Sequence, residues 1–174
     1  MRIVLASVAL FILFLSGCSN EGQIDLTIYN KGFQGITYTD AEGNIIGPVD
    51  YDDWRLGYGK YIVESPGKGA LAAKILPEHF DVAAAYPNPT SSTITFSVAA
   101  PIYIEYRIQI VNDDYYIFKE YTGVSEAGVT EYVIELRDKN DDPLPDGIYR
   151  VLYQFNEFGG YGDVWVMNNP VDIF

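Results

Sequence analysis

The segment Ile102–Ile110 has the sequence IYIEYRIQI. Its even-numbered positions carry isoleucine or tyrosine, and its odd-numbered positions carry mostly polar or charged side chains. Because successive side chains of a β-strand point to opposite faces, this alternation places one face on a core and the other toward water. β-branched and aromatic side chains suit such a half-buried sheet surface. The segment therefore predicts a strand with one buried face.

The same period of two recurs along the second half of the chain. Runs of apolar residues alternating with polar ones are separated by segments rich in turn-forming residues. Short strands at this spacing are typical of an antiparallel β-sandwich, so the predicted fold class is all-β. The predicted strands are 93–99, 102–111, 115–121, 129–136, 148–156 and 163–167, and the predicted turns lie at 112–114, 123–128, 138–147 and 159–162.

The first half of the chain predicts a smaller β-rich region. Two prolines, Pro87 and Pro89, lack N–H donors and favour extended geometry in the residues before them, which marks a boundary near this point. So small a region makes a weak core of its own, and we expect it to pack on the sandwich rather than fold alone. Its predicted elements are a strand at 24–28, a hairpin at 36–46, a strand near 61–63 and a brief helix at 70–74.

The N-terminus predicts export and a lipid anchor. Arg2 precedes the apolar run Ile3–Leu15, which is typical of a secretory signal and too short for a comfortable membrane span. The block Leu15-Ser16-Gly17-Cys18 resembles the lipobox of bacterial lipoproteins. This resemblance implies cleavage before Cys18 and acylation of that residue, and two or more acyl chains hold a protein stably on a membrane. The alternative is an ordinary cleaved signal that leaves a thiol at Cys18.

These boundaries divide the chain into three parts. They are a signal peptide at 1–17, a small β-rich region at 18–80 and a sandwich at 81–174. The expected location is the bacterial cell envelope, at the outer membrane or cell surface, with membrane lipid as a partner through acylated Cys18.

Composition excludes some partners. Eleven basic and 24 acidic residues give a net charge of −13, which becomes −14 when Arg2 is removed with the signal. Such a surface is repelled by phosphate, so we expect no nucleic-acid partner. With one cysteine the chain forms no internal disulfide, and its 48% hydrophobic content must stabilise it by packing.

Two further motifs resemble a known family. Tyr86-Pro87-Asn88-Pro89 and Asp146-Gly147-Ile148-Tyr149 are similar to the opening and the corner of FlgD-type immunoglobulin-like domains and of the C-terminal sorting domains of type IX secretion cargo. The resemblance covers about 86–168 and implies an immunoglobulin-like β-sandwich.

Physically, these motifs are structural turns. Gly147 suits the fourth position of a tight turn, and Tyr149 can lay its ring on the core with its hydroxyl at the edge. We assign the same structural role to Pro87, Asn88 and Pro89.

Catalytic chemistry finds little support in the sequence. His79 is the only histidine, and neither a catalytic triad nor a zinc site can be assembled around it. We therefore expect His79 in an exposed linker, and we expect a protein that is not an enzyme and has no cofactor.

A weak calcium site is a candidate exception. Asp138, Asn140 and Asp142 have the spacing of the first ligands of a calcium loop, although Pro143 replaces the glycine that an EF-hand requires. Such a site would share Asp146. The alternative is an acidic turn whose charges keep it soluble and unpaired.

Carboxylates beside aromatic rings form the second candidate. Asp50, Asp52, Asp53 and Trp54 lie within five residues and could line a sugar-binding groove, or supply the paired carboxylates of glycoside hydrolysis. The alternative, which we favour, is that Trp54 fills the interface between the small region and the sandwich while the aspartates face water.

Together these observations predict a non-catalytic, lipid-anchored cell-envelope protein. Its sandwich would serve as an interaction or assembly module that contacts another envelope protein or a glycan. The alternatives are a type IX secretion cargo whose second half is a sorting domain, and a carbohydrate-binding surface protein.

Overall fold

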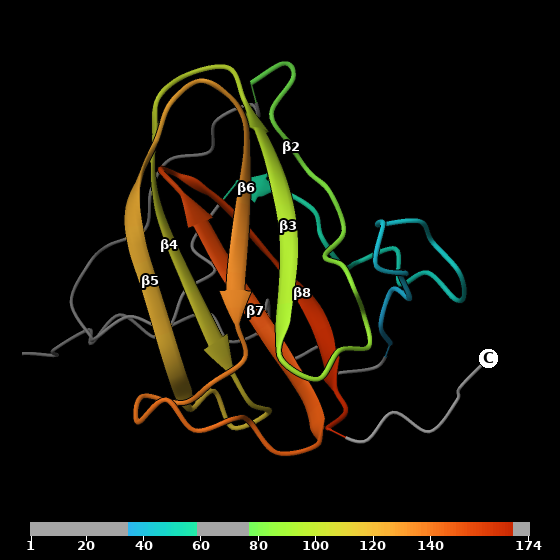
Figure 1. Ribbon diagram of the computed structural model, residues 1–174. Coiled ribbons are helices and arrows are strands. Elements are labelled where there is room, and N and C mark those ends of the chain that lie inside the picture. The colour runs from blue at the N-terminus through green and yellow to red at the C-terminus, as the bar shows by residue number, and fades with distance from the viewer. Residues whose placement is uncertain (1–34, 59–76, 169–174) are drawn as a thin grey trace, which may run out of the picture.

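The computed structural model describes residues 35–58 and 77–168 of the chain (Figure 1). Several predictions from the sequence lie outside the described residues. They are the signal peptide at 1–17, the lipidation of Cys18, the strands at 24–28 and 61–63, and the helix at 70–74.

Two antiparallel sheets pack face to face (Figure 1), and the described residues contain no helix. The predicted all-β antiparallel sandwich is therefore confirmed. The five-stranded sheet has the order β1 (Gly57–Tyr58), β8 (Phe158–Val166), β7 (Gly147–Phe155), β4 (Ile104–Val111) and β5 (Ile117–Ser125). The three-stranded sheet has the order β2 (Asp81–Val82), β3 (Thr93–Ala100) and β6 (Gly128–Glu135).

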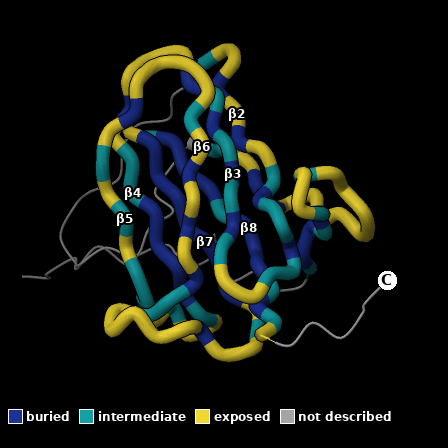
Figure 2. The backbone as a smooth tube through the Cα atoms, viewed as in Figure 1, coloured by how far each residue is buried: buried dark blue, intermediate teal, exposed yellow. Residues whose placement is uncertain are grey.

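The alternation in the sequence builds the core between the sheets. Every second residue of β3 is buried, from Ile94 to Ala100, and Ile104, Ile108 and Ile110 of β4 face it. These side chains leave water on folding, which stabilises the sandwich by about 25 cal/mol per Å² of apolar surface. Figure 2 shows exposed residues concentrated in the connecting loops and along β5 and β6.

Strands β7 and β8 are buried on both faces. Tyr149, Val151 and Tyr153 of β7 belong to the core between the sheets. The intervening residues Arg150 and Leu152 point to the other face and are also buried. Burial on both faces makes this pair of strands the most enclosed part of the sheet (Figure 2).

The predicted turn at Gly159–Gly162 was wrong. These residues lie inside β8, and the chain instead reverses at Asn156 and Glu157, with Asn156 in the left-handed region at φ 51°. The glycines serve a close approach. A Cβ on Gly160 would lie 1.8 Å from the carbonyl oxygen of Arg55, and one on Gly162 would lie 2.1 Å from the Trp54 ring. Glycine inside a strand is typical of such contacts as well as of turns.

The hairpin predicted at 36–46 is present and contacts the sandwich. Thr39 bridges Ile45 within the hairpin, and the Oδ1 atom of Asp40 accepts the amide of Asn44 at 2.8 Å to close the turn. On its other side Thr39 pairs with Asn88, and its hydroxyl donates to the carbonyl of Ala85 at 2.7 Å. The described part of the small region thus packs on the sandwich.

Replacing Gly162 should damage the contact with Trp54. Gly162→Ala forces a methyl group into the indole ring, so we expect a loss of about 1–3 kcal/mol in the free energy of unfolding. Gly147→Ala is the matched control, because Gly147 has no positive φ and a Cβ there would meet only the Tyr149 ring, at 3.7 Å. Denaturant titration measures both. Equal losses in the two variants would contradict the close-approach role of Gly162.

Candidate binding groove

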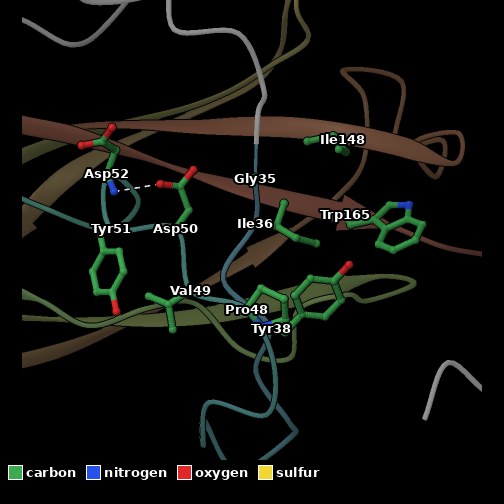
Figure 3. A pocket seen from close by; sticks show the side chains of 10 residues that line it. All are labelled: Gly35, Ile36, Tyr38, Pro48, Val49, Asp50, Tyr51, Asp52, Ile148 and Trp165. Atoms are coloured by element: carbon green, nitrogen blue, oxygen red, sulfur yellow. Dashed lines mark hydrogen bonds between the residues drawn. The ribbon is translucent and has the colours of Figure 1, made fainter.

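A groove of about 760 Å³ opens between the hairpin region and the outer face of the five-stranded sheet (Figure 3). The segment from Gly35 to Asp52 forms one wall. Ile148 of β7 and Trp165 of β8, which are register partners, form the other. Pockets of this size are suited to small ligands or to one short segment of a partner.

The groove has two chemically different ends. Figure 3 shows Trp165 and Tyr38 at one end, where their rings meet edge to face with centroids 6.5 Å apart. Asp50, Tyr51 and Asp52 lie together at the other end (Figure 3), and the amide of Asp52 donates to Oδ1 of Asp50 at 2.9 Å. Among the residues that the structure describes, no lysine, arginine or histidine lines the groove. One end is therefore aromatic, and the other combines two carboxylates with an aromatic ring.

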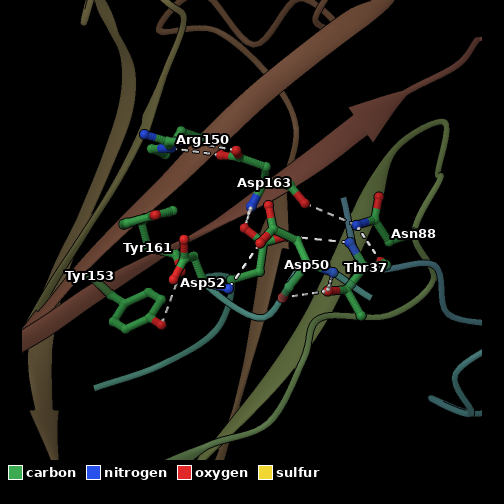
Figure 4. A network of polar contacts seen from close by, with 9 residues as sticks. Thr37, Asp50, Asp52, Asn88, Arg150, Tyr153, Tyr161 and Asp163 are labelled. Atoms are coloured by element: carbon green, nitrogen blue, oxygen red, sulfur yellow. Dashed lines mark hydrogen bonds and ion pairs between the residues drawn. The ribbon is translucent and has the colours of Figure 1, made fainter. Parts of the chain in front are cut away.

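Beneath the groove, side chains seal the outer edge of β8 (Figure 4). A strand edge carries backbone groups that must find partners when they are buried. At this edge Oδ1 of Asp53 accepts the amide of Asp163 at 3.1 Å. The side-chain amide of Asn88 then donates to the carbonyl of Asp163 and accepts the amide of Trp165. The backbone of Thr90 then pairs with Trp165 at 3.0 Å. The groove wall therefore rests on a satisfied strand edge.

Asn88 uses every polar group it has. Its Nδ2 donates to the carbonyls of Thr37 and Asp163, both at 2.9 Å, and its Oδ1 accepts the amide of Trp165 at 3.0 Å. Its backbone exchanges two hydrogen bonds with Thr39, at 2.9 and 3.1 Å. The residue is fully buried, and the peptide bonds before Pro87 and Pro89 on either side of it are cis. Asn88 thus joins the hairpin, the linker and β8 at one point.

Asp53 is a buried carboxyl group that contacts two backbone segments. Oδ2 accepts the amide of Thr37 at 3.3 Å, and Oδ1 accepts that of Asp163. Burial, followed by the nearby charges of Asp163 and Asp50, raises the pKa of Asp53 from its usual 3.8 to about 8. Asp53 therefore ties the hairpin to β8 from the inside.

Arg150 and Asp163 form a buried ion pair on the outer face of β7 and β8. Two bonds of 2.7 Å join the guanidinium to the carboxylate, in the bidentate geometry that gives strong pairs. The guanidinium also lies 4.1 Å from the centre of the Tyr161 ring. Burial opposes the charge, but the bonds to Asp163 outweigh it and raise the pKa of Arg150. This cation next to the groove is thus already neutralised.

The residues at the predicted corner have structural contacts. The hydroxyl of Tyr149 donates to the carbonyl of Pro145 at 3.0 Å, and its ring is buried against Phe118. This is the arrangement of the tyrosine corner in β-sandwiches. Gly147 begins β7 and does not occupy the left-handed region, so its backbone conformation does not require glycine.

The predicted binding cluster divides in the structure. Asp50 and Asp52 line the groove, but Asp53 and Trp54 point away from it and are buried, with exposed fractions of 6% and 4%. Trp54 fills the core between Phe96 and Tyr153, as the alternative in the sequence analysis proposed. That alternative was wrong in placing every aspartate in water, because backbone donors compensate the burial of Asp53.

Sequence reasoning did not connect the two walls of the groove. Trp165 and Ile148 come from strands more than ninety residues downstream of the aspartates, and Tyr38 comes from the hairpin. No local pattern joins these positions. The signal available in the sequence was an aromatic residue, Trp165, within the predicted strand 163–167.

The candidate calcium residues are engaged in turn hydrogen bonds. Oδ1 of Asp138 accepts the amides of Asn140 and Asp142 at 2.8 and 2.9 Å, and the bond from Asp142 is the main cause that lowers the pKa of Asp138. Asp146 instead accepts two bonds from Asn168. Within 35–58 and 77–168, no three acidic, histidine or cysteine side chains gather as a metal site would require. Calcium binding stays a prediction.

His79 lies where it was predicted. Its side chain is 86% exposed in the segment before β2, with Glu78 as a neighbour at 3.8 Å. This position is remote in sequence from every residue that lines the groove.

The chain has a partial structural similarity to a known protein. No protein-family model matches the chain, and no curated protein matches it in sequence. Among solved structures, the chain is similar to the crystal structure of FlgD from P. aeruginosa, with a TM-score of 0.35 and 14% sequence identity. The similarity covers 44% of this chain and 70% of the FlgD chain.

The raised pKa of Asp53 predicts a pH-dependent stability. The folded protein keeps a proton that the unfolded chain releases near pH 3.8, and it loses this proton only near pH 8. The stabilising contribution is complete below the lower value and disappears as pH rises through the upper one. We expect the midpoint temperature of thermal unfolding to decrease as the pH rises from about 5 to about 9. The decrease should be smaller in Asp53→Asn.

Asp113→Asn, which removes an exposed carboxylate from the loop after β4, is the control and should keep the wild-type slope. An unchanged slope in Asp53→Asn would show that another group is responsible.

Proposed function

We propose that this protein is a non-catalytic, lipid-anchored component of the bacterial cell envelope. Its lipobox cysteine, Cys18, tethers it to a membrane, and its β-sandwich is an interaction module that binds a partner through the groove. No described segment is a helix of the length and hydropathy that crossing a bilayer requires.

The single observation that carries the binding role is the groove itself. Asp50 and Asp52 lie at the surface beside Tyr51, which is 74% exposed. The buried ionisable groups next to it, Asp53, Arg150 and Asp163, contact one another or the backbone. Exposed apolar patches often mark binding sites, and aromatic side chains contribute much of the binding energy at protein interfaces.

A glycan is the second candidate for the same groove. Aromatic rings beside carboxylates are present there, as a carbohydrate-binding protein would require. The interaction-module hypothesis includes this ligand class. The secretion-cargo alternative stays a prediction from the sequence.

The tether is tested by fractionation. Cys18→Ala removes the acceptor of the acyl groups, so we expect the protein to leave the membrane fraction and to lose labelling by a palmitate analogue. Cys18→Ser is a second variant that keeps the size of the side chain and should behave in the same way. A wild-type protein whose intact mass shows an unmodified thiol would contradict the anchoring.

The groove is tested by site-specific photo-crosslinking in the native envelope. A photoreactive residue at Tyr51 should capture one recurrent partner, because this position borders the groove. The same residue at Val129, which is 75% exposed on β6 of the other sheet, is the matched control and should not capture it. Equal capture from both positions, or none from Tyr51, would contradict a groove-centred interaction.

A further inference from the structure

Strand β6 is the least protected sheet edge among the described strands (Figure 1). The edge strands β1 and β2 have two residues each, which leaves little for another chain to pair with. The edge strand β5 carries Lys119, and its ladder with β4 is irregular at Ile110 and Val111. β6 has eight residues, pairs with β3 without a register shift and contains neither lysine nor proline. It therefore lacks the devices that commonly prevent a strand edge from pairing.

The hydrogen bonds of β3 determine which backbone groups of β6 point outward. Thr95 exchanges two backbone hydrogen bonds with Tyr86, at 2.7 and 2.8 Å, and Ser97 accepts one from Ala83 at 2.9 Å. Residues of an antiparallel strand bond alternately to its two sides. The odd-numbered residues of β3 therefore bond away from β6, and the even-numbered residues bond toward it.

The same alternation continues in β6. The register pairs odd-numbered residues of the two strands, for example Thr95 with Val133. Val129, Glu131 and Val133 therefore direct their N–H and C=O groups away from β3. Within 35–58 and 77–168, no backbone group pairs with them. These three residues offer donors and acceptors to a further strand.

The side chains of these three residues form a row on the exposed face of the sheet. Val129 is 75% exposed and Val133 is 63% exposed, and Glu131 between them is also exposed; Figure 2 shows exposed residues along this strand. The open row ends at Glu135, because its carbonyl accepts the hydroxyl of Tyr121 at 3.1 Å. Side chains directly opposite each other on paired strands interact, so this row selects apolar, basic and apolar partners.

We infer that β6 is a strand-addition site that binds an extended segment of a partner protein with the pattern apolar-x-basic-x-apolar. The segment lies antiparallel to β6, exchanges backbone hydrogen bonds with Val129, Glu131 and Val133, and places its basic residue opposite Glu131. In such complexes the main-chain bonds supply affinity and alternate side chains supply specificity. The site is on the three-stranded sheet, apart from the groove, and goes beyond the proposed function.

A second copy of this chain fits the edge poorly. An antiparallel copy aligned on the same three residues would place Glu131 opposite Glu131, and like charges directly opposite destabilise a strand pair. The net charge of −13 adds to the repulsion between copies. The partner is therefore a different protein, and pairing between copies is an outcome that the experiment distinguishes.

The test uses the full-length protein, purified from its native envelope in detergent, and a fluorescent capped peptide, Thr-Val-Thr-Lys-Thr-Val-Thr. Fluorescence anisotropy at about 0.1 M salt, where distant charges are screened, measures the affinity. We expect binding that is weakened about tenfold or more by backbone N-methylation at the lysine and one valine, whose N–H groups point toward β6. N-methylation at the two threonines beside the lysine, whose N–H groups point away, is the matched control and should change the affinity less than about threefold.

A charge exchange tests the position of the basic residue. Glu131→Lys should weaken binding of the lysine peptide by about fivefold and should strengthen binding of the same peptide with glutamate in place of lysine. Asp113→Lys makes the same change of charge in the exposed loop after β4, and should alter either affinity less than about twofold. Equal thermal midpoints of the two variants exclude misfolding, and the N-methylated peptides decide the question if Glu131→Lys does not fold.

Three results would overturn the inference. They are no binding at millimolar peptide, equal effects of the two N-methylated peptides, and equal effects of Glu131→Lys and Asp113→Lys. Sedimentation of a dimer that Glu131→Pro dissociates would instead assign the edge to a second copy, because that variant removes an outward N–H group at a position where an edge strand tolerates proline. If Tyr51 captures a partner while the peptide fails, the proposed function stands and this inference falls.

Discussion

The sealing of the β8 edge by the side chain of Asn88 is the interaction on which the rest of the arrangement depends. An amide side chain presents one acceptor and two donors, and here it occupies the place of a peptide group beside the strand, between the carbonyl of Asp163 and the amide of Trp165. Its second N–H group donates to the carbonyl of Thr37, so the same side chain that completes the strand edge also attaches the hairpin. Unpaired groups at this buried position would each cost about 1–3 kcal/mol, which makes the contact hard to replace.

The groove is a consequence of this attachment. Its aromatic wall contains Trp165, whose amide is held by Asn88, and its acidic wall continues directly into Asp53, which binds the same strand. The two walls are therefore fixed relative to each other by bonds beneath the surface, in addition to the ring contact between Tyr38 and Trp165. A preformed groove avoids part of the ordering cost of binding, which suits a module whose role is to hold a partner.

The sequence predicted the parts of the fold that local chemistry controls. The alternation that includes Ile104, Ile108 and Ile110 identified β4 and its buried face. Burial of one side of a strand makes apolar residues recur at every second position. The glycines of β8 were misassigned, since a glycine that admits Trp54 looks the same in sequence as one that makes a turn. Asp50 and Asp52 were found as candidate binding residues, but their position in one groove with Tyr38 and Trp165 was not predicted. The side chain of Asn88 acts on residues 51, 75 and 77 positions away, and no local pattern encodes such contacts.

The most direct measurement is native-state hydrogen exchange of the amides along the β8 edge. If Asn88 and Asp53 make this edge part of one cooperative unit, the amides of Asp163, Trp165 and Thr39 exchange through the same global opening as the amides of the interior strand β4. Their opening free energies then agree with the free energy of unfolding of the whole domain. Exchange of these three amides through a separate opening, at a free energy lower by about 2 kcal/mol or more, would contradict it and show that the hairpin and the groove detach while the sandwich stays folded.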